Sequence, residues 1–249
     1  MSGSKTAKGG FNYEHQLVGE FNNWKHSQSA RKMLSAMDIV AGDIQSILAK
    51  KVKGSVKPDI EIEILFNNGK KRKIPISVKK YVPSADFNHV CRSSVEKYHT
   101  IFGFDKITFE CLSVFTGEVT PSSHPELLKS GVTLSGKRKT FKDFEESLVA
   151  GVLDWFEKNL EKVITYSFCG EKQKPEFLII GQDTGNGIHP HVYGMSDVVG
   201  YLSQKGVSIS PRGSIKLGNG EMTFQRKGGT GSPTNLQFKF KPSEILRNL

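Results

Sequence analysis

The sequence predicts an α/β fold from three observations: an alternating hairpin, several amphipathic helices and a strand-rich C-terminal region. Apolar and acidic residues alternate over 59–64, and the alternation returns over 74–78 after the turn "NNGKK". Side chains in a strand repeat every two residues, so this pattern predicts two paired strands with one buried face. After about residue 207 the chain alternates and turns repeatedly, which predicts further strands.

Helices are expected on both sides of the hairpin in the sequence. Apolar stripes at helical spacing predict them at 11–24, 38–50, 88–102, 140–164 and 196–206. Asp38 and Thr140 are the expected caps of two of these helices. A short buried strand is expected at 176–181, and residues 1–10 are expected to form a flexible basic arm.

The composition is that of a soluble globular protein, with 249 residues, 37% hydrophobic and 24% charged. No apolar run is long enough for a transmembrane helix, and the first ten residues lack the apolar core of a secretory signal. Cys91, Cys111 and Cys169 are far apart and form no CxxC, so neither a zinc site nor a disulfide framework is expected. The chain is therefore expected in a reducing cytoplasm, with no membrane partner.

The basic charge is clustered. The net charge is +10; residues 50–80 hold ten basic residues, and residues 205–249 hold eight basic and two acidic ones. Such clustering favours a polyanionic partner, of which nucleic acid is the commonest.

Asp59, Ser77 and Lys79 carry the strongest chemical pattern. The hairpin brings Asp59 near the second strand, where Ser77 and Lys79 share a face. An acid that holds a divalent cation, together with a lysine that orients water and offsets charge, can hydrolyse a phosphodiester. The same stretch also fits a surface hairpin with polar residues outward. A Ser–Lys hydrolase is the weaker alternative, because no nucleophile elbow surrounds Ser77.

A metal ion at this position would need oxygen ligands. Asp59 and the Val78 carbonyl are the expected donors, and Ser77 is a poorer ligand than a carboxylate. Glu14 and Glu20, on the first expected helix, are the candidates for an additional carboxylate.

The arrangement Pro58-Asp59 … Ser77-Val78-Lys79 has the layout of a PD-(D/E)xK nuclease core, with serine at the usual carboxylate position. Three further stretches are "GSKTAKGGFNYE", "DFNHVCRSSVEKYHTIFGF" and "SISPRGSIKLGNGEMTFQRKGGTGSPTNLQFKFKPSEIL". In order and spacing they resemble the HinP-type Type II restriction endonucleases, which cut the palindrome GCGC. The resemblance runs from about residue 3 to 246 and is thin between about 105 and 200.

The resemblance implies a restriction-endonuclease-like α/β core, a mixed central sheet flanked by helices, with a β-rich C-terminal region that reads DNA. It implies one domain over 1–249, with 1–165 mainly catalytic and 166–249 mainly for recognition. Asp59, Ser77 and Lys79 are then the catalytic residues, and Mg²⁺ is the cofactor, held by Asp59, Val78 and Glu14 rather than Glu20. A member of this family carries glutamine at the position of Ser77.

The resemblance also implies the DNA contacts. It places at Phe87 an aromatic that wedges into the duplex from the minor groove, although a core position is the alternative. Guanine donors and amide readers of bases are expected in the C-terminal region. Lys239 and Lys216 are expected on phosphates. The complete set of expected DNA contacts is Phe87, Asn88, His89, Ser210, Arg212, Gln225, Arg226, Lys227, Gln237 and Lys239.

The implied partners are double-stranded DNA and, as a genetic partner, a cognate cytosine methyltransferase in a bacterial cytoplasm. The enzyme is expected to act as a monomer or homodimer. Two alternatives stay open: a DNA-binding protein with a decayed site, motivated by Ser77, and a less specific repair-type nuclease. His189-Pro-His191 is interpreted as a loop and not a metal site, and the nearby glycines do not form a GxGxxG motif.

Overall fold

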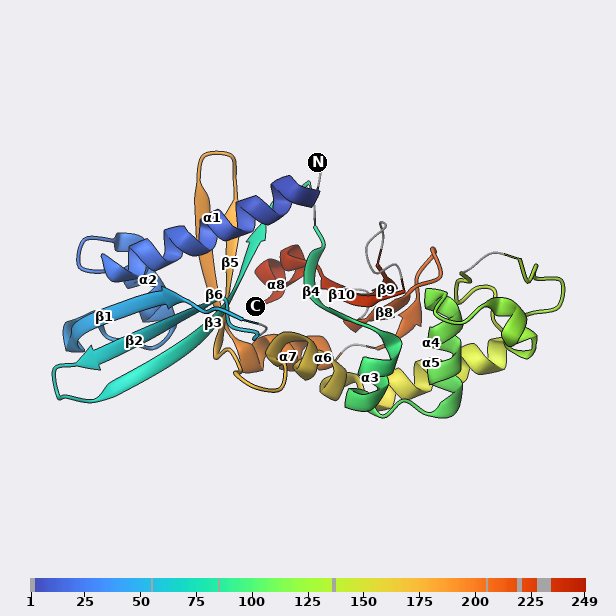
Figure 1. Ribbon diagram of the computed structural model, residues 1–249. Helices are drawn as coiled ribbons and strands as arrows, with labels where there is room; N and C mark the ends of the chain where they lie inside the picture. Colours follow the sequence, from blue (N-terminus) through green and yellow to red (C-terminus); the bar gives the residue numbers. More distant parts are fainter. Residues whose placement is uncertain are drawn as a thin grey trace. The chain divides into compact units, whose positions relative to one another are not determined.

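The protein forms two compact units, each made from separate stretches of chain. The computed structural model describes residues 3–54, 56–84, 86–135, 138–204, 206–218, 221–227 and 234–249, with side chains from residue 10 onward (Figure 1). Unit 1 comprises Met1–Asn88, Phe168–Val199 and Pro242–Leu249, and unit 2 comprises His89–Ser167 and Gly200–Lys241.

Unit 1 contains a mixed five-stranded sheet. Its strands lie in the order β1 (Ile44–Lys51), β2 (Ile60–Phe66), β3 (Lys71–Tyr81), β5 (Phe177–Asp183) and β6 (Ile188–Gly194). The first three strands form an antiparallel meander, β3 pairs with β5 in parallel, and β6 returns antiparallel. The hairpin and the short strand expected at 176–181 are confirmed as β2, β3 and β5.

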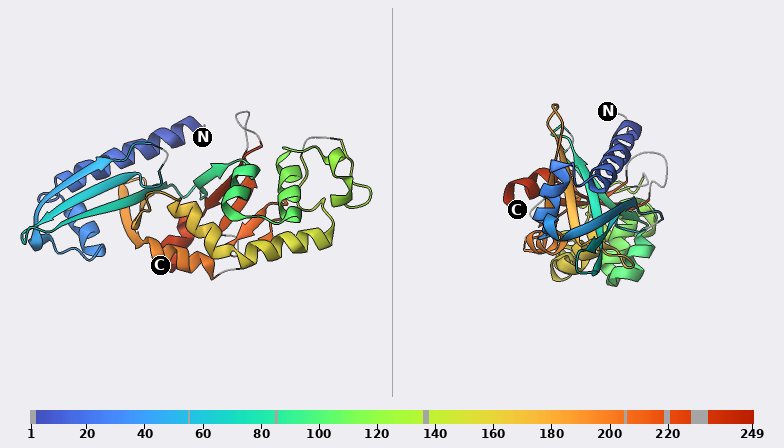
Figure 2. Two further views of the ribbon diagram at one scale, coloured as in Figure 1. Left: turned by 60° about the horizontal axis from the view of Figure 1, so that its bottom comes forward. Right: turned by 90° about the vertical axis from the view of Figure 1, so that its left-hand side faces the viewer.

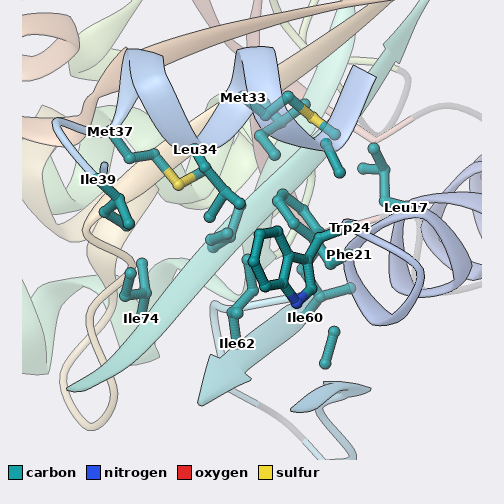
Figure 3. Packing of buried hydrophobic residues seen from close by; sticks show 14 of the residues in the cluster. Leu17, Phe21, Trp24, Met33, Leu34, Met37, Ile39, Ile60, Ile62 and Ile74 are labelled. Atoms are coloured by element: carbon teal, nitrogen blue, oxygen red, sulfur yellow. The ribbon is translucent and has the colours of Figure 1, made fainter. Parts of the chain in front are cut away.

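Helices α1 (Gly3–Asn22) and α2 (Gln28–Ala36) cover one face of this sheet. Leu17, Phe21 and Trp24 of the expected helical stripe are buried there, against the isoleucines of β2 and β3 (Figure 3). Ile60, Ile62, Ile64, Ile74 and Ile76 are all fully buried. The same face carries Val78, so the alternate residues Ser77 and Lys79 point to the opposite face.

Unit 2 contains a second five-stranded sheet and an aromatic core. Its sheet has the order β4 (Asn88–Ser93), β10 (Leu236–Phe240), β9 (Met222–Arg226), β8 (Ile215–Leu217) and β7 (Ser208–Ile209). The rings of Phe224 and Phe238 stack with centroids 4.2 Å apart, and Tyr98 packs on their edges. The expected strand-rich C-terminal region is therefore confirmed.

The remaining elements complete the chain (Figures 1 and 2). They are η1 (Ala41–Asp43), α3 (Val95–Phe102), α4 (Lys106–Thr116), η2 (Pro121–Ser123), η3 (Pro125–Leu127), α5 (Glu146–Lys158), α6 (Leu160–Cys169), α7 (Met195–Ser203) and α8 (Pro242–Asn248). Within the described residues, every helix is too short or too polar to cross a membrane.

The helix expected at 38–50 is wrong. Residues 44–51 form strand β1, which pairs along its length with β2, from Ile44 opposite Phe66 to Lys51 opposite Ile60. The spacing of Ile44, Ile47 and Leu48 imitates a helical face, but Leu48 is 61% exposed. Pairing with a strand far along the chain outweighs this local pattern.

The long helix expected at 140–164 is also wrong in extent. It is two helices, α5 and α6, and it begins only at Glu146. Thr140 and Asp143 form a turn in which the Asp143 carboxylate accepts from the Thr140 backbone N–H at 2.7 Å. The N–H of Phe141 donates to the Gly213 carbonyl and that of Glu145 to the Leu127 carbonyl, so sequence-distant partners replace the first helical turns.

Three smaller expectations need correction. Residues 88–93 are a strand, and the helix begins at Val95 with Ser94 as its cap. His189-Pro-His191 lies in β6, an edge strand, where a proline is tolerated because one side of the strand needs no partner. The expected N-terminal arm is helical from Gly3.

Candidate active site

Asp59 lies at the entrance to β2, beside the carboxyl end of β1 and against the middle of β3. Its backbone N–H donates to the Ile76 carbonyl at 2.9 Å, and its carbonyl accepts from the Val52 N–H at 3.0 Å. These two bonds hold Asp59 at one end of the β1–β2–β3 meander. The hairpin thus brings Asp59 next to Ser77, 18 positions later.

Three donor groups surround one carboxylate oxygen of Asp59. Its Oδ2 accepts from the Val78 backbone N–H at 2.6 Å and from Ser77 Oγ at 3.1 Å. Lys79 Nζ lies 3.5 Å from the same oxygen, with the lysine and aspartate side chains 19% and 27% exposed. The predicted catalytic residues therefore form one contiguous cluster, partly open to solvent.

Lys79 is held in place by β3 itself. Its ammonium also donates to the Val78 carbonyl at 3.0 Å and lies 3.4 Å from Ser77 Oγ. Ser77 is only 5% exposed, and the lysine ammonium lies beside both the serine hydroxyl and the carboxylate. A positive charge fixed beside an acid can align water and offset charge on a phosphate.

The oxygen atoms at this strand end fit a hard divalent cation. Asp59 supplies a carboxylate, Val78 a carbonyl and Ser77 a hydroxyl, all within the hydrogen-bonded cluster. Mg²⁺ commonly binds through one or two carboxylates while it keeps several waters and takes the remaining ligands from substrate phosphates. Among the described residues, no three His, Cys, Asp or Glu side chains are grouped to hold a metal.

Glu14 already has a cationic partner. Its Oε2 lies 2.7 Å from Lys51 Nζ, and the two side chains are 14% and 25% exposed. Lys51 is the last residue of β1 and is paired with Ile60, the neighbour of Asp59, so this ion pair lies at the same end of the sheet as Asp59. Sequence reasoning missed Lys51, because only the β1–β2 register distinguishes it from the other lysines nearby.

Glu20, the second candidate carboxylate of α1, has a different environment from Glu14. Its Oε1 accepts from Gln16 Nε2 at 2.9 Å, which is a bond within α1. Its charge contributes, after burial, to raising the pKa of Tyr13 above the usual tyrosine range. Tyr13 itself packs against Gly181 of β5.

Phe87 is presented to solvent. It is 42% exposed, which does not fit the alternative of a core position. The next residue, Asn88, donates its side-chain amide to the Lys80 carbonyl at 2.9 Å. His89 follows on β4 and is exposed.

Three of the expected recognition residues share one face of the unit 2 sheet. Gln225 is directly opposite Gln237, and Lys239 is opposite Thr223. Lys216 of β8 is also opposite Thr223 and extends the same row. The neighbouring residues Phe224 and Phe238 point into the aromatic core, so this polar face lies on the other side.

Arg226 does not lie on that face. It is opposite Leu236, which is fully buried, and its Nη1 donates to the carbonyls of Phe115 and Lys139 at 3.2 and 3.1 Å. Its guanidinium also lies 5.2 Å from the centre of the Phe115 ring. Burial lowers the pKa of Arg226, and the nearby Arg138 contributes. These contacts are internal to unit 2.

Ser210 and Arg212 lie in a tight turn between β7 and β8. The Ser210 hydroxyl accepts from the Ser214 N–H at 2.9 Å, and Arg212 is exposed at the tip. Gly213 has a positive φ of 73°, and an added Cβ would lie 2.5 Å from Thr140 Cβ, so only glycine fits. Lys227 directly follows β9 and donates its backbone N–H to the Asn235 carbonyl. The sequence "KGGTGSP" predicts a loop over 227–233, of which 228–233 lie outside the described residues.

Comparison with known proteins found a matching family and a similar solved structure. The family model described as R.HinP1I restriction endonuclease matches residues 33–246. Among solved structures, the restriction endonuclease MspI in complex with its cognate DNA is similar at 17% identity. The TM-score is 0.65, and the match covers 95% of this chain and 91% of that one. No curated protein sequence matches the chain.

Proposed function

The chain belongs to the R.HinP1I restriction endonuclease family and is a Type II site-specific deoxyribonuclease, and we propose that it uses Mg²⁺ to cut double-stranded DNA at GCGC. The observation that carries the proposal is the cluster of Asp59, Ser77 and Lys79 at one strand end. The MspI structure, which has this fold, was solved with its cognate DNA, and this supports a duplex substrate.

Each member of the cluster has a separate task in this proposal. Asp59 is the principal carboxylate of the site, kept in position by the Val78 N–H and the Ser77 hydroxyl. Lys79 orients the attacking water and offsets the charge that develops on the phosphate. A bound Mg²⁺ supplies Lewis-acid stabilisation of that charge and lowers the pKa of water. The products carry 5′-phosphate and 3′-hydroxyl ends.

The metal ligands in this proposal are Asp59, the Val78 carbonyl, Ser77 and, at a second and weaker position, Glu14. The Lys51 ammonium lies 2.7 Å from Glu14 Oε2 and competes with a cation for this carboxylate. Similarly, the Lys79 ammonium, which donates to the Val78 carbonyl, competes with a cation for this oxygen. Metal binding is therefore expected to rearrange both lysines.

Sequence recognition is assigned to the polar face of the unit 2 sheet and to the turn at Arg212. Gln225 and Gln237 both donate and accept, and Arg212 is an exposed guanine donor. Ser210 and Lys227 flank these groups, and Lys239 and Lys216 hold phosphates. A base contact by Arg226 stays a prediction, and it would require the guanidinium to leave its two carbonyl partners.

Phe87 is the proposed wedge, with Asn88 and His89 beside it. An exposed aromatic costs little to insert once the duplex is open, and a kinked duplex contacts more protein surface. We assign catalysis mainly to residues 1–165 and recognition mainly to 166–249. The enzyme acts as a monomer or homodimer in a bacterial cytoplasm, where a cytosine methyltransferase protects the host DNA.

Lys79→Ala separates this function from a DNA-binding protein with a decayed site. Cutting of a GCGC-containing plasmid should be lost while binding is kept, because Lys79 acts on water and charge and not on base recognition. If the wild type binds that DNA and never cuts it in Mg²⁺ or Mn²⁺, the enzyme proposal fails. Discrete bands support a site-specific enzyme, whereas a smear would favour the repair-type nuclease.

Salt dependence tests the assignment of the basic clusters. A protein that neutralises several phosphates releases counterions, so its affinity for DNA falls by roughly 10³-fold or more between about 50 and 200 mM salt. Affinity for the specific duplex that stays constant over this range would contradict the assignment. Fluorescence anisotropy with a labelled GCGC duplex measures it.

A further inference from the structure

Phe87 lies between two residues that are each anchored within unit 1. On one side, Asp86 Oδ1 accepts from the Ser243 backbone N–H at 3.2 Å, and its Oδ2 accepts from the Ser243 hydroxyl. On the other side, Asn88 Nδ2 donates to the Lys80 carbonyl of β3 at 2.9 Å. The aromatic side chain between these anchors is 42% exposed.

Asp86 is anchored to the first turn of α8. Ser243 is the second residue of this helix, where backbone N–H groups have no partner within the helix. The carboxylate satisfies one of them and also the Ser243 hydroxyl, which is the role of a helix cap supplied by another segment of chain. Ile245, two residues later, is fully buried, so α8 is itself fixed to unit 1.

The same contacts connect Phe87 to the catalytic strand. Tyr81, two residues after Lys79, ends β3 and is 8% exposed. Burial raises the pKa of Tyr81, the Asp86 charge raises it further, and Arg247 of α8 opposes the rise. Tyr81, Asp86 and α8 therefore lie close enough to influence one another, near the end of the strand that carries Lys79.

A wedge must be rigid before it meets DNA. Fixing a flexible segment on binding costs backbone and side-chain entropy, and a segment held in its bound conformation avoids that cost. We propose that Asp86 is a positioning residue, which fixes Phe87 through α8 for insertion into the duplex. This inference rests on the proposed role of Phe87 as a wedge.

The test measures base unstacking directly. A GCGC duplex carries the fluorescent base pyrrolocytosine at one cytosine, and its fluorescence rises when the base loses its stacking partners. Without divalent cation, the wild-type enzyme should raise the signal and Phe87→Ala should not. Asp86→Ala and Ser243→Ala should both lose more than half of the rise. The Asp86→Ala dissociation constant should increase by about tenfold, since the freed segment must be ordered on binding.

A double variant distinguishes positioning from a general loss of structure. In the Phe87→Ala background, adding Asp86→Ala should change the dissociation constant by less than about twofold, because the two residues act through one contact. Asp105→Ala is the matched control: Asp105 caps α4 by accepting from the Thr108 N–H at 2.7 Å, in unit 2. It should lower stability similarly and leave the fluorescence rise intact.

The outcomes separate the two claims. A full fluorescence rise with Phe87→Ala would overturn the wedge and this inference with it. Loss of the rise with Phe87→Ala, but a full rise with Asp86→Ala and Ser243→Ala, would overturn the inference alone. If Asp86→Ala does not fold, as judged by circular dichroism, Ser243→Ala decides the question, since it removes only a hydroxyl.

Discussion

Ser77→Asp places a second carboxylate in the cluster and tests where the metal binds. The Ser77 hydroxyl lies 3.1 Å from Asp59 Oδ2 and 3.4 Å from Lys79 Nζ. At an effective dielectric of about 20, a new negative charge there would be repelled by Asp59 and attracted by Lys79 by roughly 5 kcal/mol each. The two charge effects nearly cancel, which leaves the desolvation of a carboxylate at a position only 5% exposed as the main cost. Circular dichroism checks that the variant folds without metal.

A divalent cation bound between the carboxylates of position 77 and Asp59 would offset their mutual repulsion, so the added charge should favour cation binding. The affinity of oxygen sites for cations rises with the number of charged ligands, so we expect the dissociation constant of Mg²⁺ to fall by about 10- to 100-fold, or roughly 1.4 to 2.8 kcal/mol. Ser77→Ala should have the opposite, smaller effect, because the site loses the neutral hydroxyl ligand of Ser77. Isothermal titration of the protein with Mg²⁺, without DNA, measures both.

The control is Ser46→Asp, the same change at an exposed position of β1 in the same sheet. It should leave Mg²⁺ affinity unchanged. If Ser77→Asp binds Mg²⁺ no more tightly than the wild type, Ser77 does not lie next to the cation and the reasoning is refuted. Equal tightening by both variants would refute it as well, since a general charge effect would then be responsible.

Three further changes have defined outcomes. Lys51→Met frees Glu14, so Mn²⁺ affinity measured by titration should rise by about fivefold, the equivalent of roughly 1 kcal/mol of ion pairing. Burial, with a smaller contribution from a neighbouring histidine, lowers the pKa of His191. The unfolded chain then binds more protons below about pH 6.5, so stability falls as pH falls through that range, and urea unfolding of His191→Gln should show less of this loss. Gly181→Ala places a Cβ 2.3 Å from the Tyr13 ring and should cost about 1–3 kcal/mol in urea unfolding.

Each of these has a matched control. Lys50→Met breaks the neighbouring ion pair with Glu61 and should not change Mn²⁺ affinity. His15→Gln alters an exposed histidine of α1 and should keep the pH dependence. Gly19→Ala adds a Cβ with no atom within 4 Å in helix α1 and should stabilise the protein by about 0.5–1 kcal/mol. A control that behaves like its partner would contradict the corresponding explanation.

Sequence alone determined the hairpin and the relative positions of its candidate catalytic residues. Alternation has a period of two, so Ser77 and Lys79 had to share a face while Ile76 and Val78 faced the core. Asp59 had to lie near them because the turn is short. The strand-rich C-terminal region and the family resemblance also followed from residues in local order, and the family match over 33–246 confirms the resemblance.

Tertiary structure decided which local patterns were realised. Residues 44–51 have apolar spacing close to that of a helix, yet they form β1 because β2 supplies backbone partners along its whole length. Phe141 and Glu145 have helical spacing, but their N–H groups bond to Gly213 and Leu127. A local pattern does not contain the position of a partner that lies elsewhere in the chain.

The same reason explains the charged residues. Glu14 was identifiable as a carboxylate on a helix, but only the register of β1 against β2 places Lys51 beside it. Arg226 reads as a guanine donor in "QRKGG", and only the packed unit 2 turns it inward to the Phe115 and Lys139 carbonyls. Asp86 has no recognisable motif at all, because its partner Ser243 lies 157 positions away. Periodicity determines the face on which a side chain lies, whereas its charged partner is determined by folding.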